Sequence, residues 1–456
     1  MRQTFRALAV RNYRLYAAGA LVSNIGTWMQ RVGQDWLVLQ LSGGSGAALG
    51  ITTGLQFLPM LLLSPFAGLL ADRFPKQRLL ICTQIAMAVP AVVLGTLAIT
   101  GLAQTWHVYV LALLFGIGTA FDAPARQSFV VEIVGRDDLT NAVGLNSASF
   151  NLARVVGPAV AGGLIALLGS GPGATGWVIV ANGVSYLGVV GSMLAMRTAD
   201  LTPADAVGRG GGSIREGWRY VRGRPDLVLV LVVVFFVGTF GLNFQLTSAL
   251  MATTVFHKGA GEYGLLASVM AVGSLAGALL AARRARPTLR LVVGAAIGFC
   301  LTEIVAGMLP TYWVFMAWLP LLGLFALTVI TTANATMQLT VVPHMRGRVA
   351  ALYMMVFMGG TPLGAPIIGW VGEVFGARWT LIGGGAVALL GTLAAAGLYA
   401  WRHGLVIRAH LGRHPGLDVL TRAQVDREQS EHDAADRLPP DGDRPRDEPS
   451  SRSLAG

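Results

Sequence analysis

Residues 227–256 read LVLVLVVVFFVGTFGLNFQLTSALMATTVF and contain no Asp, Glu, Lys or Arg. About 20 consecutive apolar residues are enough for a helix to cross the hydrocarbon core of a bilayer. The run is continuously apolar rather than alternating between apolar and polar residues, which disfavours a strand of a membrane β-barrel. This stretch therefore predicts a transmembrane helix.

Eleven further stretches have the same character and set the fold class. The twelve predicted spans are 15–40, 47–71, 79–101, 106–125, 142–168, 175–196, 227–256, 261–282, 289–309, 311–335, 349–372 and 378–401. Of the 456 residues, 54% are hydrophobic and only 12% are charged, about half the charged fraction of a soluble protein. Two cysteines are too few for a secreted disulfide scaffold. The sequence predicts an all-α polytopic membrane protein with twelve transmembrane helices.

Basic residues are concentrated in alternate connections between these spans. With the N-terminus inside, 21 of the 25 Lys and Arg residues of 1–401 fall on the inner side, as the positive-inside rule requires. We therefore expect both termini in the cytoplasm. Topology and anionic lipid account for the sequence pI of about 10.3, so the expected partner is the lipid bilayer and no nucleic acid.

The two halves of the chain resemble each other weakly. Gly68–Leu80 (GLLADRFPKQRLL) ends span 2 and Gly277–Leu291 (GALLAARRARPTLRL) ends span 8. Two six-helix bundles related by a pseudo-two-fold axis are a common transporter design. The predicted parts are an N-terminal bundle over 1–196, a cytoplasmic loop with a basic amphipathic helix over 197–226, a C-terminal bundle over 227–401 and a disordered cytoplasmic tail over 402–456.

Polar and charged side chains inside spans 1 and 5 are candidates for a cavity. An Arg or Asp at the centre of a membrane helix costs about 2.5–3.5 kcal/mol on insertion scales, so such residues favour a neighbouring helix or water. The two sets, each at helical spacing, are Asn24, Trp28, Arg31 and Asp35 in span 1, and Asn151 and Arg154 in span 5. We expect them to line a substrate or coupling cavity in which Asp35 pairs with Arg31 or Arg154. The alternative is a permanent ion pair that only fixes the packing.

Two residues of the second half extend this candidate cavity. Glu303 stands in span 9 with no cation in the same helix, and burial disfavours an isolated carboxylate anion, so it is a candidate proton carrier. The alternative is a place near the outer interface, from which its side chain reaches water. Asn243 in span 7 accompanies aromatic and methionine side chains that suit an amphipathic guest, although plain packing explains such a pattern equally well.

A gate is expected at the cytoplasmic end of span 2, where Gly68 precedes Asp72 and Arg73. Arg73 can reach Asp122 at the inner end of span 4, and we place Arg126 in the same gate. Such pairs would form in one orientation of the bundles and break in the other. The alternative is a simple basic turn.

Glycine and proline in spans 5 and 11 predict hinges. Gly157, Pro158 and Pro362 permit close approach and bending, which suits helices that move at a bundle interface. Ordinary packing of small residues is the alternative.

The sequence carries no Walker-type phosphate loop, metal cluster or hydrolytic triad. We therefore expect no ATP motor, no cofactor, no bound metal and no enzymatic activity.

These residues are similar to the major facilitator superfamily over about 1–400. The runs Leu21–Leu41, Phe121–Val131 and Asn146–Ala161 resemble the enterobactin-exporter and macrolide-efflux branch of drug:proton antiporters. Pro75 and Gln77 depart from the superfamily signature after span 2, and span 4 lacks the embedded arginine of many proton-coupled antiporters. The resemblance implies proton-driven export from the cytoplasm across the plasma membrane, with Asp72 and Arg73 as the inner gate and Gly157–Pro158 as the hinge.

The leading hypothesis is secondary active export of an amphipathic small molecule, such as a siderophore, drug or secondary metabolite, by a monomer. Alternating access would be coupled to protons by antiport. The alternatives are a receptor or scaffold that has a transporter fold but moves nothing, and an importer or uniporter of a small metabolite.

Overall fold

The computed structural model describes residues 5–135, 137–202, 214–283, 287–410 and 416–421. Within them, eleven helices are long and apolar enough to cross a membrane. The remaining predicted span is the 31-residue helix α1 (Arg11–Leu41), whose charged and amide side chains lower its hydropathy. The all-α membrane fold is therefore confirmed.

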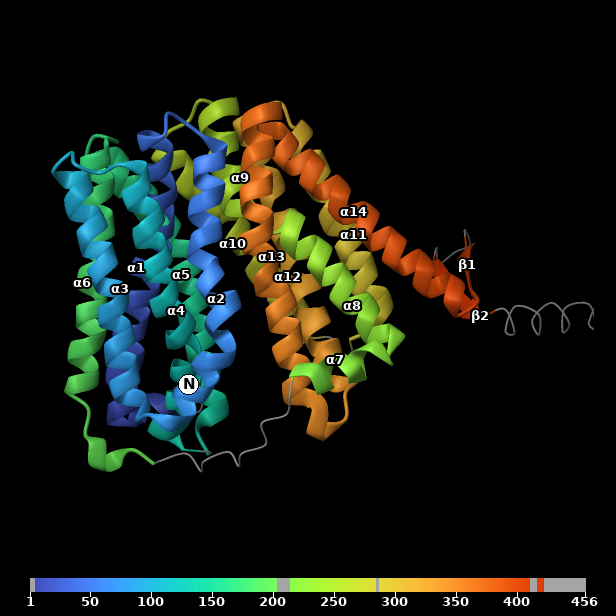
Figure 1. The fold of residues 1–456 in the computed structure, drawn as a ribbon, viewed down its shortest axis with the longest axis horizontal. Helices are drawn as coiled ribbons and strands as arrows, with labels where there is room; N and C mark the ends of the chain where they lie inside the picture. Colours follow the sequence, from blue (N-terminus) through green and yellow to red (C-terminus); the bar gives the residue numbers. More distant parts are fainter. Residues whose placement is uncertain (1–4, 136, 203–213, 284–286, 411–415, 422–456) are drawn as a thin grey trace, which may run out of the picture. The chain divides into compact units, whose positions relative to one another are not determined.

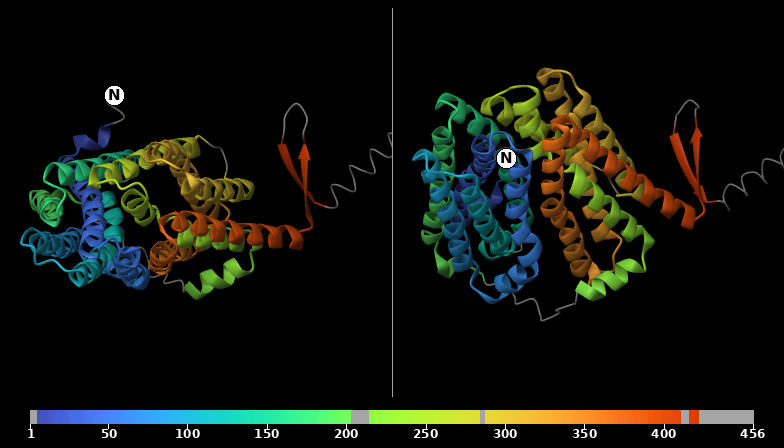
Figure 2. Two further views of the ribbon diagram at one scale, coloured as in Figure 1. Left: turned by 90° about the horizontal axis from the view of Figure 1, so that it is seen from above. Right: turned by 45° about the horizontal axis from the view of Figure 1, so that its top comes forward.

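The N-terminal half contains six long helices. They are α1, α2 (Gly46–Arg73), α3 (Lys76–Ile99), α4 (Thr105–Val134), α5 (Leu139–Leu167) and α6 (Pro172–Leu194), with short 3₁₀ turns η1 (Arg6–Ala9) and η2 (Thr198–Asp200). These helices lie side by side (Figures 1 and 2). Aromatic and aliphatic side chains, including Tyr13, Tyr16 and Phe129, fill the core at one end of the group.

The remaining helices form the second half. They are α7 (Ile214–Arg222), α8 (Pro225–Phe236), α9 (Phe244–Leu250), α10 (Ala260–Ala282), α11 (Leu289–Met308), α12 (Tyr312–Leu339), α13 (Arg346–Phe375) and α14 (Ala377–Arg402), with the 3₁₀ turn η5 (Pro343–Met345) before α13. Helix α7 is the basic helix predicted in the connecting loop, and its Glu216 pairs with Arg348 of α13 at 2.8 Å. Residues 203–213 of that loop lie outside the described residues.

The predicted span 227–256 is interrupted rather than continuous. Two π-helical turns, η3 (Val237–Gly241) and η4 (Met251–Val255), flank α9, and Leu242 and Asn243 are not helical. The Asn243 side chain donates a 2.8 Å hydrogen bond to the Thr239 carbonyl, which satisfies a backbone acceptor that the break releases. Breaks of this kind in membrane helices persist only where other protein groups replace the lost hydrogen bonds.

Glycines bring the two halves into backbone contact along two helix pairs, α2 with α13 and α5 with α10. A Cβ atom on Gly46 would lie 2.6 Å from the Gly369 carbonyl oxygen, and one on Gly54 would lie 3.0 Å from a side-chain atom of Pro366. Gly264 of α10 packs directly on the Pro158 carbonyl of α5. These contacts all lie toward the end of the helices at which α1 is joined to α2.

The last part of the chain contains a pair of β-strands. Residues 1–393 and 394–456 are separate compact units, and each is described by itself. In the second unit, β1 (Leu405–His410) pairs antiparallel with β2 (Gly416–Thr421), with Leu405 opposite Thr421. These strands lie within the region 402–456 for which the sequence predicts a disordered tail, and their β-branched Val, Ile and Thr suit strands. Residues 411–415 and 422–456 lie outside the described residues.

Adjacent glycines on α5 test the packing against α10. A Cβ atom on Gly162 would lie 3.1 Å from Gly261 Cα, whereas one on Gly163 would meet nothing within 4 Å. Gly162→Val should lower the free energy of unfolding by about 1–3 kcal/mol because it overpacks this contact. Gly163→Val is the matched control and should change it much less. Thermal unfolding of both variants in detergent measures the difference, and equal melting temperatures would contradict the packing.

Candidate functional site

A cavity of about 570 Å³ lies within the N-terminal half, lined by side chains from α1 to α6. Phe57, Met60, Phe115 and Phe150 supply apolar surface. The polar side chains of its lining are Ser23, Asn24, Thr27, Arg31, Gln56, Thr119, Asp122, Arg126, Gln127, Asn146, Ser147 and Tyr186. Small-molecule sites typically occupy about 300–1,000 Å³ and combine apolar walls with a few polar groups, so the chamber can hold a small molecule.

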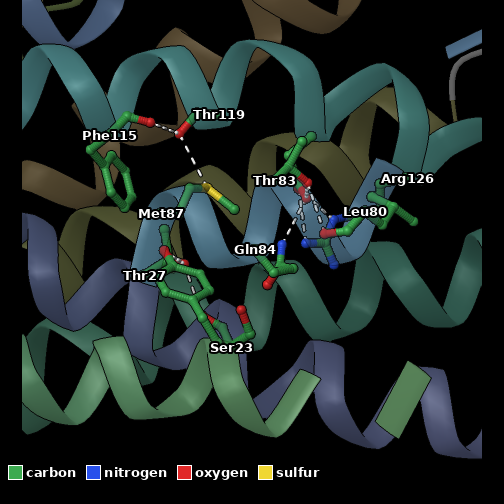
Figure 3. A network of polar contacts seen from close by, with 11 residues as sticks. Ser23, Thr27, Leu80, Thr83, Gln84, Met87, Phe115, Thr119 and Arg126 are labelled. Atoms are coloured by element: carbon green, nitrogen blue, oxygen red, sulfur yellow. Dashed lines mark hydrogen bonds and ion pairs between the residues drawn. The ribbon is translucent and has the colours of Figure 1, made fainter. Parts of the chain in front are cut away.

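Asp122 has hydrogen-bond partners at both carboxylate oxygens, and its partners Thr83, Gln84 and Arg126 lie close together in Figure 3. Its Oδ2 accepts from Arg126 Nε at 3.0 Å and Nη2 at 2.9 Å. Its Oδ1 accepts from Thr83 Oγ1 at 2.9 Å and Gln84 Nε2 at 2.7 Å. The charge of Arg126, one helical turn away, is thereby neutralised.

The expected partner of Asp122 was Arg73, but the structure places Arg126 there. Arg73 ends α2 with an exposed side chain. The surroundings of Gly68 and the side chain of Asp72 lie outside the described part of the structure, so the role of these two residues in a gate stays a prediction. At the same end of the half, Lys76 forms a 3.0 Å ion pair with Glu132.

Arg31 has an unusual environment for a charged group. Its guanidinium carbon lies 4.7 Å from the centroid of the Trp28 ring and 5.6 Å from that of Phe57. Arg154 lies 5.7 Å from the same Trp28 ring. The Arg31 Nε is buried and has no hydrogen-bond partner. Two positive charges therefore share one indole ring, an arrangement stabilised by cation–π attraction.

Asp35 does not form the expected ion pair with either arginine. The carboxylate, 7% exposed, accepts a 2.8 Å hydrogen bond from the hydroxyl of Tyr263 on α10. The ring of Tyr263 also stacks on Trp36, with centroids 6.4 Å apart. Sequence reasoning missed Tyr263, because a tyrosine near the start of an apolar span carries no signal for a partner on α1.

Glu303 lies in the other half, on α11. The residue is 1% exposed, and its Oε2 has no hydrogen-bond partner. A Cβ atom on Gly241 would lie 3.0 Å from this oxygen, so the carboxyl group packs against the π-helical turn η3. The side chain therefore does not reach the surface. The interfacial alternative required that it did, so the structure does not support that alternative. Asn243, 5% exposed, ends the same break.

The remaining candidates lie at helix contacts rather than in the cavity. Gly157 packs on α1, where its Cβ would lie 2.6 Å from Trp28 Cβ. Pro158 contacts α10, and the Pro362 carbonyl lies near Gly54. The Asn151 side chain donates to the Ser147 carbonyl of its own helix at 2.8 Å. Their roles as hinge or cavity residues stay predictions.

A second carboxylate joins the halves and was also missed. Glu373, near the end of α13, accepts hydrogen bonds at Oε2 from Ser45 Oγ at 2.5 Å and from the Ala47 N–H at 2.9 Å. Ser45 is the N-cap of α2. A carboxylate is favourable at the positive end of a helix, so Glu373 completes the start of α2 from the other half.

Comparison with known proteins identifies the family to which this chain belongs. The family described as "Transmembrane secretion effector" matches residues 3–403. The chain belongs to this family. It is thus a multi-pass membrane transporter of the major facilitator superfamily, as the resemblance predicted.

Several relatives are similar to this chain along most of their length. The multidrug efflux pump Tap of Mycolicibacterium fortuitum is 28% identical over 80% of this chain and 90% of its own. The staphyloferrin A transporter of Staphylococcus aureus is 25% identical over 77% and 87%. Macrolide efflux protein A of Streptococcus pyogenes is 23% identical over 75% and 85%.

Solved structures show the same fold as this chain. A bacterial homologue of the human lysosomal transporter Spinster, in an inward-facing and occupied conformation, has a TM-score of 0.67 and 16% identity over 86% of this chain and 97% of its own. A mutant of the nucleoside transporter NupG has a TM-score of 0.66 and 9% identity over 85% and 98%.

The buried Asp122–Arg126 pair in the cavity can be tested against a more exposed ion pair. Asp122→Asn leaves the charge of Arg126 buried without its partner and should cost about 3–5 kcal/mol of stability. Glu216→Gln breaks the Arg348 pair, in which the glutamate side chain is 52% exposed, and should cost less than about 1 kcal/mol. Denaturant unfolding in micelles compares the two, and an equal loss would show that Asp122 contributes no more than a surface ion pair.

Proposed function

We propose that the protein is a secondary active exporter that moves an amphipathic small molecule out of the cytoplasm by alternating access. The observation that carries this proposal is the cavity, which combines aromatic and methionine surface with charged groups inside membrane-spanning helices. An amphipathic guest can satisfy both kinds of surface at once. The names of the relatives, two of them efflux proteins, support the direction.

In the proposed topology the protein lies in the plasma membrane with both termini in the cytoplasm. The proposed oligomeric state is a monomer. The basic loops support this orientation. The backbone contacts between the halves, at Gly46–Gly369 and Pro158–Gly264, then lie on the extracellular side. This arrangement corresponds to a state closed to the outside, ready to accept a molecule from the cytoplasm.

Proton antiport is the proposed source of energy, with Asp35 and Glu303 as carriers. Buried carboxyl groups inside membrane helices commonly belong to proton relays. Glu303 has an unpartnered oxygen beside an interrupted helix, and the single side-chain partner of Asp35 that the structure records is the neutral hydroxyl of Tyr263. A proton can therefore be added to either group without displacing a described arginine.

Transport in inside-out vesicles tests the function. Vesicles containing the protein should accumulate a radiolabelled macrolide or staphyloferrin A when acidified inside by respiration, and an uncoupler should abolish the uptake. A comparison of metabolites released by cells with and without the protein widens the search if neither probe is a substrate. A receptor or scaffold would show no gradient-driven uptake of any released metabolite, and an importer would accumulate its substrate in right-side-out vesicles instead.

Glu303→Gln tests the carrier. An amide cannot carry the proton, so gradient-driven uptake should fall at least about tenfold at equal protein level. Glu216→Gln, on α7 and outside the spans, is the control and should transport at the wild-type rate. Wild-type uptake by Glu303→Gln would remove this residue as a carrier.

Glu373→Gln tests the extracellular closure. The change weakens a charge-assisted contact between the halves by about 1.5–3 kcal/mol, so the population open at this end should rise about tenfold or more. Spin labels on Leu41→Cys and Phe375→Cys, in a Cys82→Ser and Cys300→Ser background, report the separation. Glu262→Gln removes a carboxylate that caps its own helix and should leave the distances unchanged. Equal distance distributions in both variants would contradict the closure.

A further inference from the structure

The charge balance of the cavity rests on three charged side chains among the described residues that line it. These are Arg31, Asp122 and Arg126. Asp122 is engaged by Arg126 and by two neutral donors. The positive charge of Arg31 therefore has no counter-ion on the cavity wall.

No neighbouring group among the described residues forms an ion pair with Arg31. Among the ion pairs that the described residues form, none includes Arg31, Arg154 or Asp35. Arg154, on the same indole as Arg31, adds a second positive charge. Asp35 lies one helical turn from Arg31, close enough to pair with it, but its Oδ2 accepts the hydrogen bond from Tyr263.

We propose that Arg31 binds a carboxylate on the transported molecule, and that Tyr263 positions this site by holding Asp35 away from Arg31. The inference rests on the proposed function and adds the substrate class, an aryl or otherwise apolar carboxylate. A guanidinium binds a carboxylate through two parallel N–H donors, and Arg31 lies on the cavity wall with no counter-ion among the described residues there. Phe57, whose ring lies against Arg31 in the cavity wall, receives the apolar part.

The position of Tyr263 has a mechanistic consequence. Tyr263 belongs to α10 in the second half, whereas Arg31 and Asp35 belong to α1 in the first. If the halves separate at this contact, Asp35 loses the hydroxyl and the nearest unpaired cation on its own helix is Arg31. The Asp35 carboxylate then competes with the substrate carboxylate for Arg31. This competition favours release of the substrate in the opposite conformation.

Binding of matched aromatic probes to the full-length protein in nanodiscs tests the inference. The probes are 2-naphthoate, its methyl ester and 2-naphthylmethylammonium, which share a ring system and differ in charge. Naphthoate should bind at least about tenfold more tightly than the other two, and Arg31→Gln should remove about 10- to 100-fold of that affinity, as expected for hydrogen bonds to a charged group. Arg31→Lys, which keeps the charge but not the paired donors, should fall between.

A double-mutant cycle separates positioning from general damage. Tyr263→Phe should weaken naphthoate binding about fivefold or more because Asp35 becomes free to pair with Arg31. Adding Asp35→Asn to Tyr263→Phe should restore the affinity to within about twofold of the Asp35→Asn single variant. Tyr353→Phe, which removes a buried hydroxyl bonded to the Ile330 carbonyl in the second half, is the control and should bind like wild type.

Several results would overturn the inference. They are equal binding of the ester and the acid, no binding of any probe, no effect of Tyr263→Phe, and no recovery in the double variant. The binding measurement is independent of transport. Tight naphthoate binding without gradient-driven uptake of any substrate would contradict the proposed export but not the carboxylate site. Macrolide export by a protein that does not prefer naphthoate would contradict the carboxylate site but not the proposed export.

Discussion

A charged group within membrane-spanning helices must find its partner inside the protein, because hydrocarbon offers none. The N-terminal half meets this requirement in two different ways. Asp122 and Arg126 neutralise each other and take two further donors from α3. Arg31 is stabilised by the faces of aromatic rings. The first arrangement pairs opposite charges, although Arg126 Nη1 has no hydrogen-bond partner. The second pairs with no opposite charge among the described residues of the cavity wall, and this difference gives the cavity its chemical character.

The same requirement explains how the two halves are held together. Where α2 meets α13 and α5 meets α10, glycines allow backbone to touch backbone, which is the usual basis of helix association in membranes. Polar contacts between the halves occur beside these surfaces, at Asp35–Tyr263 and at Ser45–Glu373. Each contact uses a carboxylate from one half and a hydroxyl donor from the other.

Much of this organisation could be predicted from the sequence. Length and apolarity of the runs are local properties, so the spans follow from counting, and the i, i+4 spacing of Asp122 and Arg126 is visible once a helix is assumed. Partners on other helices are not local. The Tyr263 hydroxyl reaches Asp35 across 228 positions of the chain, and Asp122 binds Arg126 in this structure rather than Arg73. The interruption of 227–256 was missed because its residues remain apolar, although Gly238, Gly241 and Asn243 weaken a helix there.

The contact of Glu373 with the start of α2 affects how the two halves separate. The first N–H groups of α2 have no acceptors within their own helix, and a residue from the opposite half supplies one. When the halves part at this point, the helix start and the carboxylate both lose a neighbour and need solvent to replace it. The contact lies at the start of α2 and near the end of α13 and is exposed, so water replaces part of what is lost and the net cost of separation is about 1.5–3 kcal/mol. A seal made in this way can open and close repeatedly with only a small driving force.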